Sequence, residues 1–238
     1  MYYLLKHSDE LHIYRDFFSD SYQQHNVARL QHLASLGLPL DGKRVLEVGA
    51  GIGDHSIFYL YRNCDVLPTD GRRENVEFLK RRLNIRAEVL DPERNIEQMS
   101  SLGRFDVLHC YGFLYHISNP EVFLAHAPRC AAMMVLETCV SFGDQLEKNP
   151  VGEQAEVLCQ ALHGKGCRPT RPWIMHELKK GYPHVYCTRT QPKHPEFPLD
   201  WTQPPANPRA LIRAVFVASH APISNPLLTS ELPLRHST

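Results

Sequence analysis

Residues 45–54 read VLEVGAGIGD, an apolar run that ends in an acid and is followed by three glycines at alternate positions. This pattern is typical of a strand that leads into a helix across a nucleotide-sized ligand. Glycine is needed where the backbone turns sharply and lies against the ligand, because a Cβ would collide there. Gly49, Ala50, Gly51 and Gly53 are therefore predicted to form a ligand-binding loop. A G-x-G-x-G match alone is weak evidence, so the acids around it decide the interpretation.

Three carboxylates stand at the expected ends of three successive strands, Glu47, Asp70 and Asp91. In a parallel sheet these ends meet at one edge, where ligands bind. Glu47 is placed to contact an ammonium group, directly or through water. Asp70, followed by Gly71 and Arg72, can accept hydrogen bonds from two ribose hydroxyls. Asp91, followed by Pro92, can accept one from an adenine amino group, and both aspartates also suit helix N-caps.

The residue at position 54 separates two cofactor classes. A nicotinamide dinucleotide fingerprint wants a small residue there, but the chain has Asp54, whose charge would face a pyrophosphate. S-Adenosylmethionine has no phosphate and carries a sulfonium cation, so nearby acids are tolerated. The acids at positions 47 and 54 therefore favour S-adenosylmethionine.

Alternating strand and helix patterns predict a doubly wound α/β sheet with right-handed crossovers. Predicted strands are 44–48, 65–69, 86–90, 105–110 and 131–137, and predicted helices are 21–36, 54–61, 72–82, 93–101 and 120–127. After residue 137 the rhythm breaks; a helix is predicted from about 170 to 180, and strands at 184–188 and 210–219. We expect a single domain over 1–238, with an N-terminal helical cover (1–41), a cofactor-binding core (42–137), an irregular substrate-side insertion (138–209), and a last strand with a tail (210–238).

Three segments, VLEVGAGIG (45–53), TDGR (69–72) and RFDVLHCYGFLYHI (104–117), resemble the class I S-adenosylmethionine-dependent methyltransferases of the small-molecule branch. The resemblance covers about residues 40–140. It implies a Rossmann-like sheet of seven strands whose last strand, 210–219, is antiparallel. It also implies that Glu47 and the glycines line the methionine part of the cofactor, Asp70 the ribose and Asp91 the adenine, while Cys110 and Tyr111 offer backbone near the sulfonium.

The segment after the fourth predicted strand ends in Leu-Tyr-His and lacks the Asn/Asp-Pro-Pro-Tyr/Phe element of methyltransferases that act on base amines. This favours a small-molecule acceptor, with oxygen ahead of nitrogen. His116 is the candidate catalytic base, because imidazole titrates near neutral pH; the alternative is a histidine that only binds substrate or caps the loop.

Further predictions concern the substrate side and the cover of the cofactor. Glu137 is placed to orient His116 or bind substrate, with a purely structural role as the alternative. Arg171 could pair with an anionic substrate and Trp173 could stack on a ring or sugar; surface charge and core packing are the alternatives. Tyr14, Tyr22 and His25 belong to the N-terminal segment that is expected to cover the cofactor.

Composition limits the remaining possibilities. Lys+Arg and Asp+Glu are both 26, and this balance argues against bulk binding to nucleic-acid phosphates. The seven cysteines contain no C-x-x-C pair, and His176, His184 and His194 match no familiar zinc spacing, so no metal site is expected. Without a signal peptide or a run of about 20 apolar residues, we expect a soluble, cytoplasmic protein with no membrane partner. An NAD(P)-dependent oxidoreductase and a non-catalytic cofactor-binding regulator remain alternatives, and the oligomeric state stays open.

Overall fold

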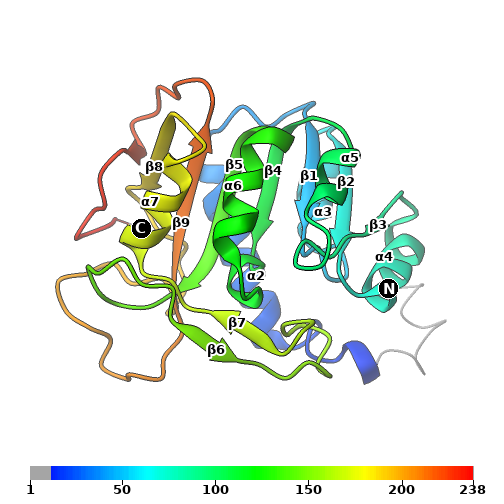
Figure 1. Cartoon of the computed structure of the whole chain (residues 1–238), viewed down its shortest axis with the longest axis horizontal. Coiled ribbons are helices and arrows are strands. Elements are labelled where there is room, and N and C mark those ends of the chain that lie inside the picture. Colours follow the sequence, from blue (N-terminus) through cyan, green and yellow to red (C-terminus); the bar gives the residue numbers. More distant parts are fainter. Residues whose placement is uncertain (1–11, 238) are drawn as a thin grey trace.

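The fold is built on one eight-stranded sheet (Figure 1). The structure is a computed structural model that describes residues 12–237, so the first eleven residues of the predicted cover lie outside it. The strands are β1 (Arg44–Val48), β2 (Asp65–Asp70), β3 (Glu88–Val89), β4 (Phe105–Tyr111), β5 (Ala131–Val140), β8 (His184–Thr188), β9 (Ile212–Ser219) and β10 (Leu228–Thr229). Their order in the sheet is β10-β8-β9-β5-β4-β1-β2-β3.

The strand directions confirm the Rossmann-like fold. β3, β2, β1, β4 and β5 are parallel, whereas β9 runs antiparallel between β5 and β8. The predicted antiparallel strand is therefore β9, and β8 was predicted with its observed bounds. The prediction of seven strands is short by one, because the two-residue β10 in the tail pairs antiparallel with β8. A strand that short forms only through its partner and leaves no alternating pattern in the sequence.

Helices cover both faces of the sheet: α2 (Asp20–Ser35), α3 (Ser56–Leu60), α4 (Arg73–Leu83), α5 (Glu97–Ser101), α6 (Pro120–Cys130) and α7 (Arg171–Lys179). Side chains of β5 alternate between the faces, as a strand requires. Met134 and Leu136 belong to the core under α6 and α7, and Met133 and Val135 belong to the core under α2. In Figure 1, α6 and α7 lie in front of the sheet and α2 lies behind it.

The insertion contains a hairpin that the sequence analysis missed. β6 (Pro150–Gly152) and β7 (Lys165–Cys167) pair antiparallel as a separate two-stranded sheet below the main one (Figure 1). A 3₁₀ turn, η2 (Leu114–His116), follows β4. Both features lie at the ends of the parallel strands. None of the helices within residues 12–237 is long and apolar enough to cross a membrane.

Candidate functional site

A cavity of about 470 Å³ opens at the carboxyl ends of the parallel strands. We call one part the cofactor end; it is lined by Gly49, Gly51, Asp70, Arg72, Asp91 and Leu162. We call the other part the acceptor end; it is lined by Arg29, Tyr115, His116, Arg168, Glu196 and Arg213. Helix α2 and the insertion close the cavity from two sides, since Tyr22, His25, Leu158 and Gln160 also line it.

The glycine loop forms a backbone cradle at the cofactor end. Gly49, Gly51 and Gly53 have φ values of +72°, +54° and +86°, which side-chain-bearing residues rarely adopt. A Cβ on Gly51 would lie 2.8 Å from the Phe17 ring, and one on Gly49 would lie 2.8 Å from Phe113. Ala50, between them, donates its N–H to Thr69 O at 2.9 Å, which fixes the loop against β2. The loop thus offers bare backbone to a ligand, as the spacing predicts.

Asp70 links the loop to the end of β2. Its Oδ2 accepts the N–H of Gly51 at 2.9 Å, and its Oδ1 accepts the N–H of Arg72 at 2.9 Å and Nδ2 of Asn75 at 3.1 Å. Burial raises the pKa of Asp70, although these hydrogen bonds oppose the shift. The carboxylate therefore has a fixed orientation beside Gly71 at the cavity, which suits a group that accepts from ribose hydroxyls.

Asp91 and Pro92 also line the cofactor end, where Leu90 ends the run that contains β3. Asp91 accepts Nε2 of His163 at 2.8 Å through Oδ2 and the N–H of Glu93 at 3.2 Å through Oδ1. The bond from the N–H of Glu93 is the kind that a helix N-cap makes, which was the alternative role of Asp91. Each carboxylate oxygen still has a lone pair for a ligand. With Asp70 and Asp91 facing this end and Arg72 as its one lining cation among residues 12–237, the charge suits a sulfonium ligand better than a diphosphate.

Glu47 differs from its predicted role. Its side chain is buried beneath the glycine loop, does not line the cavity, and accepts the hydroxyl of Ser56 at 2.6 Å. Burial raises the pKa of Glu47 to about 8, with Asp54 and Asp70 adding to the effect. The structure therefore does not support the expected direct contact with the cofactor ammonium.

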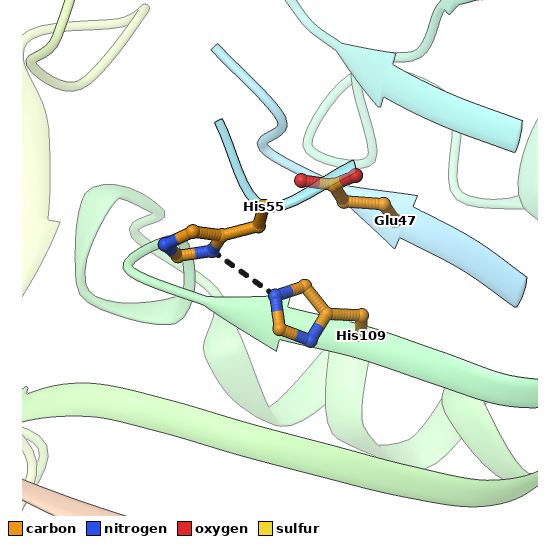
Figure 2. A group of neighbouring side chains, drawn as sticks. All are labelled: Glu47, His55 and His109. Carbon is orange, nitrogen blue, oxygen red and sulfur yellow. Dashed lines mark hydrogen bonds between the residues drawn. The ribbon is translucent and has the colours of Figure 1, made fainter. Parts of the chain in front are cut away.

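Figure 2 shows Glu47 beside His55 and His109, whose ligand atoms all lie within 4.8 Å of one another. The hydrogen bonds fix the protons of this cluster. Asn26 Oδ1 accepts from Arg29, so His55 Nε2, 3.1 Å away, must donate to it and His55 Nδ1 must accept. His109 Nε2 then donates to His55 at 3.1 Å, and His109 Nδ1 accepts the hydroxyl of Tyr59 at 2.9 Å.

Every ring nitrogen of the cluster is thus used in a chain that runs from Tyr59 to Asn26. Burial is the main cause that lowers the pKa of His109 to about 3 and that of His55 well below its usual value, with Arg29 next. Both rings are neutral at physiological pH. The cluster therefore packs against α2 through Asn26. The ring nitrogens that a metal ion would need already take part in these hydrogen bonds.

The end of β4 brings Tyr111 but not Cys110 to the cavity. Cys110 is fully buried in the core, and Tyr111 lines the acceptor end with its hydroxyl unpartnered among the described residues. Only the backbone of Cys110 could therefore serve the predicted role. Gly112 follows with φ +73°, and a Cβ there would lie 2.8 Å from Nη1 of Arg29. This glycine lets the guanidinium of Arg29 reach the cavity.

His116 lines the acceptor end from the last position of η2. Its Nδ1 lies 2.5 Å from Oε2 of Glu153, a residue of the insertion whose side chain is 3% exposed. Burial lowers the pKa of His116 below 6.5, and Glu153 opposes this shift. Glu153, not Glu137, therefore orients His116.

Glu137 instead lies between two arginines of the acceptor end. It is fully buried, with Oε2 2.8 Å from Arg29 Nη1 and Oε1 3.0 Å from Arg213 Nη1. Burial alone would raise the pKa of Glu137, but Arg213 and Arg29 hold it below its usual value. Its predicted direct contact with substrate is not supported, because it lies behind the two arginines.

The structure does not bring Arg171 or Trp173 to the cavity. Arg171 is buried over the Trp201 ring, 3.8 Å from its centroid, and donates to Pro233 O at 2.9 Å. Trp173 is part of the core under α7. Their predicted substrate roles lack support for this reason, and Trp173 matches the alternative of core packing.

The sequence analysis missed several residues that line or support the acceptor end. Arg29, Glu153, Arg168, Glu196 and Arg213 come from α2, the insertion and β9, where no motif marked them. Glu196 accepts Nε of Arg213 at 2.5 Å and lies 3.8 Å from His25. The irregularity of 138–209 is the only signal for Glu153, Arg168 and Glu196, because long irregular segments often form binding loops, and Arg29 and Arg213 lie outside it.

Comparisons with known proteins identify the family of the chain. A family model described as a methyltransferase domain matches residues 19–171. A tRNA U34 carboxymethyltransferase of Mannheimia succiniciproducens is 31% identical over 123 residues, which make up 49% of this chain and only 37% of that protein.

Solved structures share the fold at low identity. The N-terminal domain of EvdMO1 with S-adenosylhomocysteine bound has a TM-score of 0.64 at 22% identity, over 84% of each chain. A 1,6-didemethyltoxoflavin-N1-methyltransferase of Burkholderia thailandensis has a TM-score of 0.52 at 19% identity, over 89% of this chain and 84% of that one. Together with the sheet order and the cavity, the family match shows that the chain belongs to the methyltransferase-domain family, as a class I S-adenosylmethionine-dependent methyltransferase.

Proposed function

We propose that this chain methylates a hydroxyl oxygen of a small molecule. The observation that carries the proposal is the His116–Glu153 pair at the acceptor end of the cavity. S-Adenosylmethionine would be held by the glycine loop, Asp70 and Asp91. It would supply a methyl group from its positively charged sulfur, which becomes a neutral thioether when the methyl group moves to the acceptor oxygen. His116 removes the hydroxyl proton, and Arg29, Arg213 and Tyr115 surround the acceptor.

The protonation of the pair suits a general base. Burial would raise the pKa of Glu153, but its hydrogen bonds with His116 and the N–H of Ala161 and the charge of Arg168 hold it below its usual value, so the carboxylate is ionised. An ionised carboxylate only accepts, and Nδ1 of His116 therefore carries the ring proton. Nε2 keeps its lone pair, and within residues 12–237 no hydrogen bond occupies it. A neutral imidazole with an oriented lone pair can accept a proton at Nε2.

A small molecule fits the acceptor end better than a macromolecule. Its cations are already matched, because Arg29 and Arg213 pair with Glu137 and Glu196, and Arg168 pairs with Glu153 at 3.2 Å. Such a paired site lacks the excess positive charge that nucleic-acid phosphates require. The N-terminal domain of EvdMO1 was crystallised in the presence of D-fucose, so sugars are the first acceptors to test. The curated relative is named for tRNA, which makes tRNA the necessary comparison.

The test is a panel of sugars, phenols, amines and bulk tRNA incubated with S-adenosylmethionine, with the methylated product identified by mass spectrometry. We expect product with a hydroxyl acceptor, and a kcat lower by roughly 10²–10⁴-fold for His116→Gln, because the base is lost. The exposed His176→Gln serves as the control. Wild-type kcat should rise with pH through a pKa below 6.5 and level near neutrality, since His116 must be neutral. Methylation of amines or tRNA alone, or full activity of His116→Gln, would contradict the proposal. Binding of the cofactor without any product would point to the regulatory alternative.

A further inference from the structure

The hairpin β6–β7 and its connection, residues 153–164, touch both ends of the cavity. At the cofactor end, Nη2 of Arg72 donates to the carbonyls of Ala155 at 2.8 Å and Gln160 at 3.2 Å. Asn75 donates to Leu158 O at 3.3 Å, and His163 bonds Asp91 at 2.8 Å. Leu158 and Leu162 line the cavity. The connection therefore forms a wall over the place where Asp70 and Asp91 would hold the nucleoside.

The same connection fixes Glu153 together with Arg168, whose guanidinium lies 3.2 Å from Oε1 of Glu153. The Oε2 atom that bonds His116 also accepts the N–H of Ala161 at 2.9 Å. The carbonyl of Ala161 in turn accepts Nη2 of Arg72 at 3.4 Å. Since Arg72 donates its own N–H to Asp70, a continuous series of contacts runs from the cofactor end to His116. Any shift of the wall moves the backbone that positions the carboxylate.

Side chains hold this wall to the body of the protein. The backbone hydrogen bonds of residues 153–164 stay within the hairpin, such as Glu153 N–H to Gly164 O at 2.9 Å. The hairpin meets the main fold at Gly166, where a Cβ would collide with the carbonyl of Tyr115, next to His116. A segment tied on by a few side-chain contacts can open as one unit.

We propose that the β6–β7 hairpin closes over the cofactor and, by closing, delivers Glu153 to His116. Glu153 is thus a positioning residue whose placement depends on cofactor binding. This inference rests on the proposed role of His116 as the proton acceptor. It extends that role, because it makes the cofactor a requirement for orienting the base, before any acceptor has bound.

Two substitutions distinguish the closure of the β6–β7 hairpin from the effect of the Glu153 charge on His116. Glu153→Gln keeps the shape of the side chain but removes the charge that raises the pKa of His116. Gly166→Ala places a Cβ against the carbonyl of Tyr115 and 2.8 Å from Oε1 of Glu153, so it disturbs both the closure of the hairpin and the position of Glu153, whereas Gly152→Ala, on the paired strand, meets nothing within 4 Å and is the matched control.

The experiment measures S-adenosylhomocysteine affinity by calorimetry, hydrogen exchange of residues 153–164, and the His116 titration by NMR, with its signal assigned through His116→Gln. In the wild type and Gly152→Ala, we expect the ligand to slow exchange by roughly tenfold or more and to change the His116 titration. Glu153→Gln should keep the ligand-induced protection and bind S-adenosylhomocysteine with an affinity within about twofold of the wild type. In this variant, however, His116 should titrate at lower pH than in the wild type, and the ligand should not change that titration. Gly166→Ala should lose both effects.

Identical His116 titrations in wild type and Glu153→Gln would overturn the proposal. So would ligand-induced protection of residues 153–164 that leaves His116 unchanged in the wild type, or a ligand that does not protect them at all. None of these readouts needs an acceptor. If the ligand changes the His116 titration but the protein methylates no hydroxyl, the link between hairpin closure and His116 is supported and the proposed function is refuted.

Discussion

Asp70 is the side chain on which the proposed cofactor binding depends most. Three hydrogen bonds from Gly51, Arg72 and Asn75 hold its carboxylate at the end of β2. A carboxylate fixed in this way accepts from a ligand without losing side-chain freedom on binding.

We expect Asp70→Asn to weaken S-adenosylhomocysteine binding by about tenfold or more, equivalent to about 1.4 kcal/mol, because one acceptor oxygen and the charge are lost. Calorimetry gives the affinity directly. Asp41→Asn is the control, since Asp41 is 85% exposed beside Arg62. Equal affinity for Asp70→Asn and wild type would remove the ribose assignment.

The predicted residues that line the cofactor end of the cavity share one property. Gly51 and Asp70 are close in the chain and belong to a motif whose spacing follows from one strand–loop unit. Glu153 lies 37 residues from His116, and Arg29 lies 108 residues from Glu137, in segments without a pattern. Arg171 and Trp173 were misassigned because composition does not tell which way a helix faces. Contacts that depend on how distant segments pack cannot be read from local spacing.

At the scale of elements, Glu137 joins three of them. The carboxylate lies on β5 and pairs with Arg29 of α2 and Arg213 of β9. Two further hydrogen bonds link α2 to the C-terminal part of the chain. His32 Nε2, within the helix, lies 3.0 Å from Oγ1 of Thr190, and Asn225 Nδ2 donates to the carbonyl of Leu36, just after the helix, at 2.7 Å. The helix that covers the cavity is therefore attached through a buried ion network.

We expect Glu137→Gln to lower the free energy of unfolding by about 3–5 kcal/mol, because two buried guanidinium groups lose their shared counter-charge. Urea unfolding at neutral pH measures this change. Glu121→Gln, which breaks the more exposed pair with Lys148, should cost at most about 1 kcal/mol. A loss for Glu137→Gln no larger than that of the control would show that the network contributes little.

Elements with strong periodicity were predicted, and those that depend on partners were not. The buried strands β1, β4 and β5 and the helix α6 follow from apolar runs and from Pro120 at a helix start. β6, β7 and β10 have two or three residues each and form through pairing alone. The hairpin was therefore hidden in the region that sequence analysis left irregular.

At the scale of the whole molecule, buried groups with opposite pKa shifts shape the dependence of stability on pH. The pKa of Glu47 is about 8, so the folded state keeps a proton that the unfolded state releases above about 4.5. Stability from this group is lost as pH rises through that range. His109, with a pKa of about 3, acts in the other direction, since the unfolded state binds its proton below 6.5.

Between pH 6.5 and 8 a comparison of the wild type with Glu47→Gln isolates the contribution of Glu47, because all other titrating groups are common to the two proteins. We expect the wild type to lose stability relative to Glu47→Gln with a slope approaching about 1.4 kcal/mol per pH unit. Urea unfolding of both proteins at several pH values in this range tests it, because glutamine keeps the partner of Ser56 without a titrating group. Parallel stability curves would mean that Glu47 is already ionised in the folded protein.

The central claim is that the cavity holds S-adenosylmethionine at the glycine loop with the acceptor end beyond it. A crystal structure of the protein with S-adenosylhomocysteine tests this most directly. We expect the ribose on Asp70, the amino-acid part along Gly49 and Gly51, and the sulfur facing the end that contains His116. An empty glycine loop in crystals that contain the compound, or a nucleotide diphosphate held there in its place, would contradict the account.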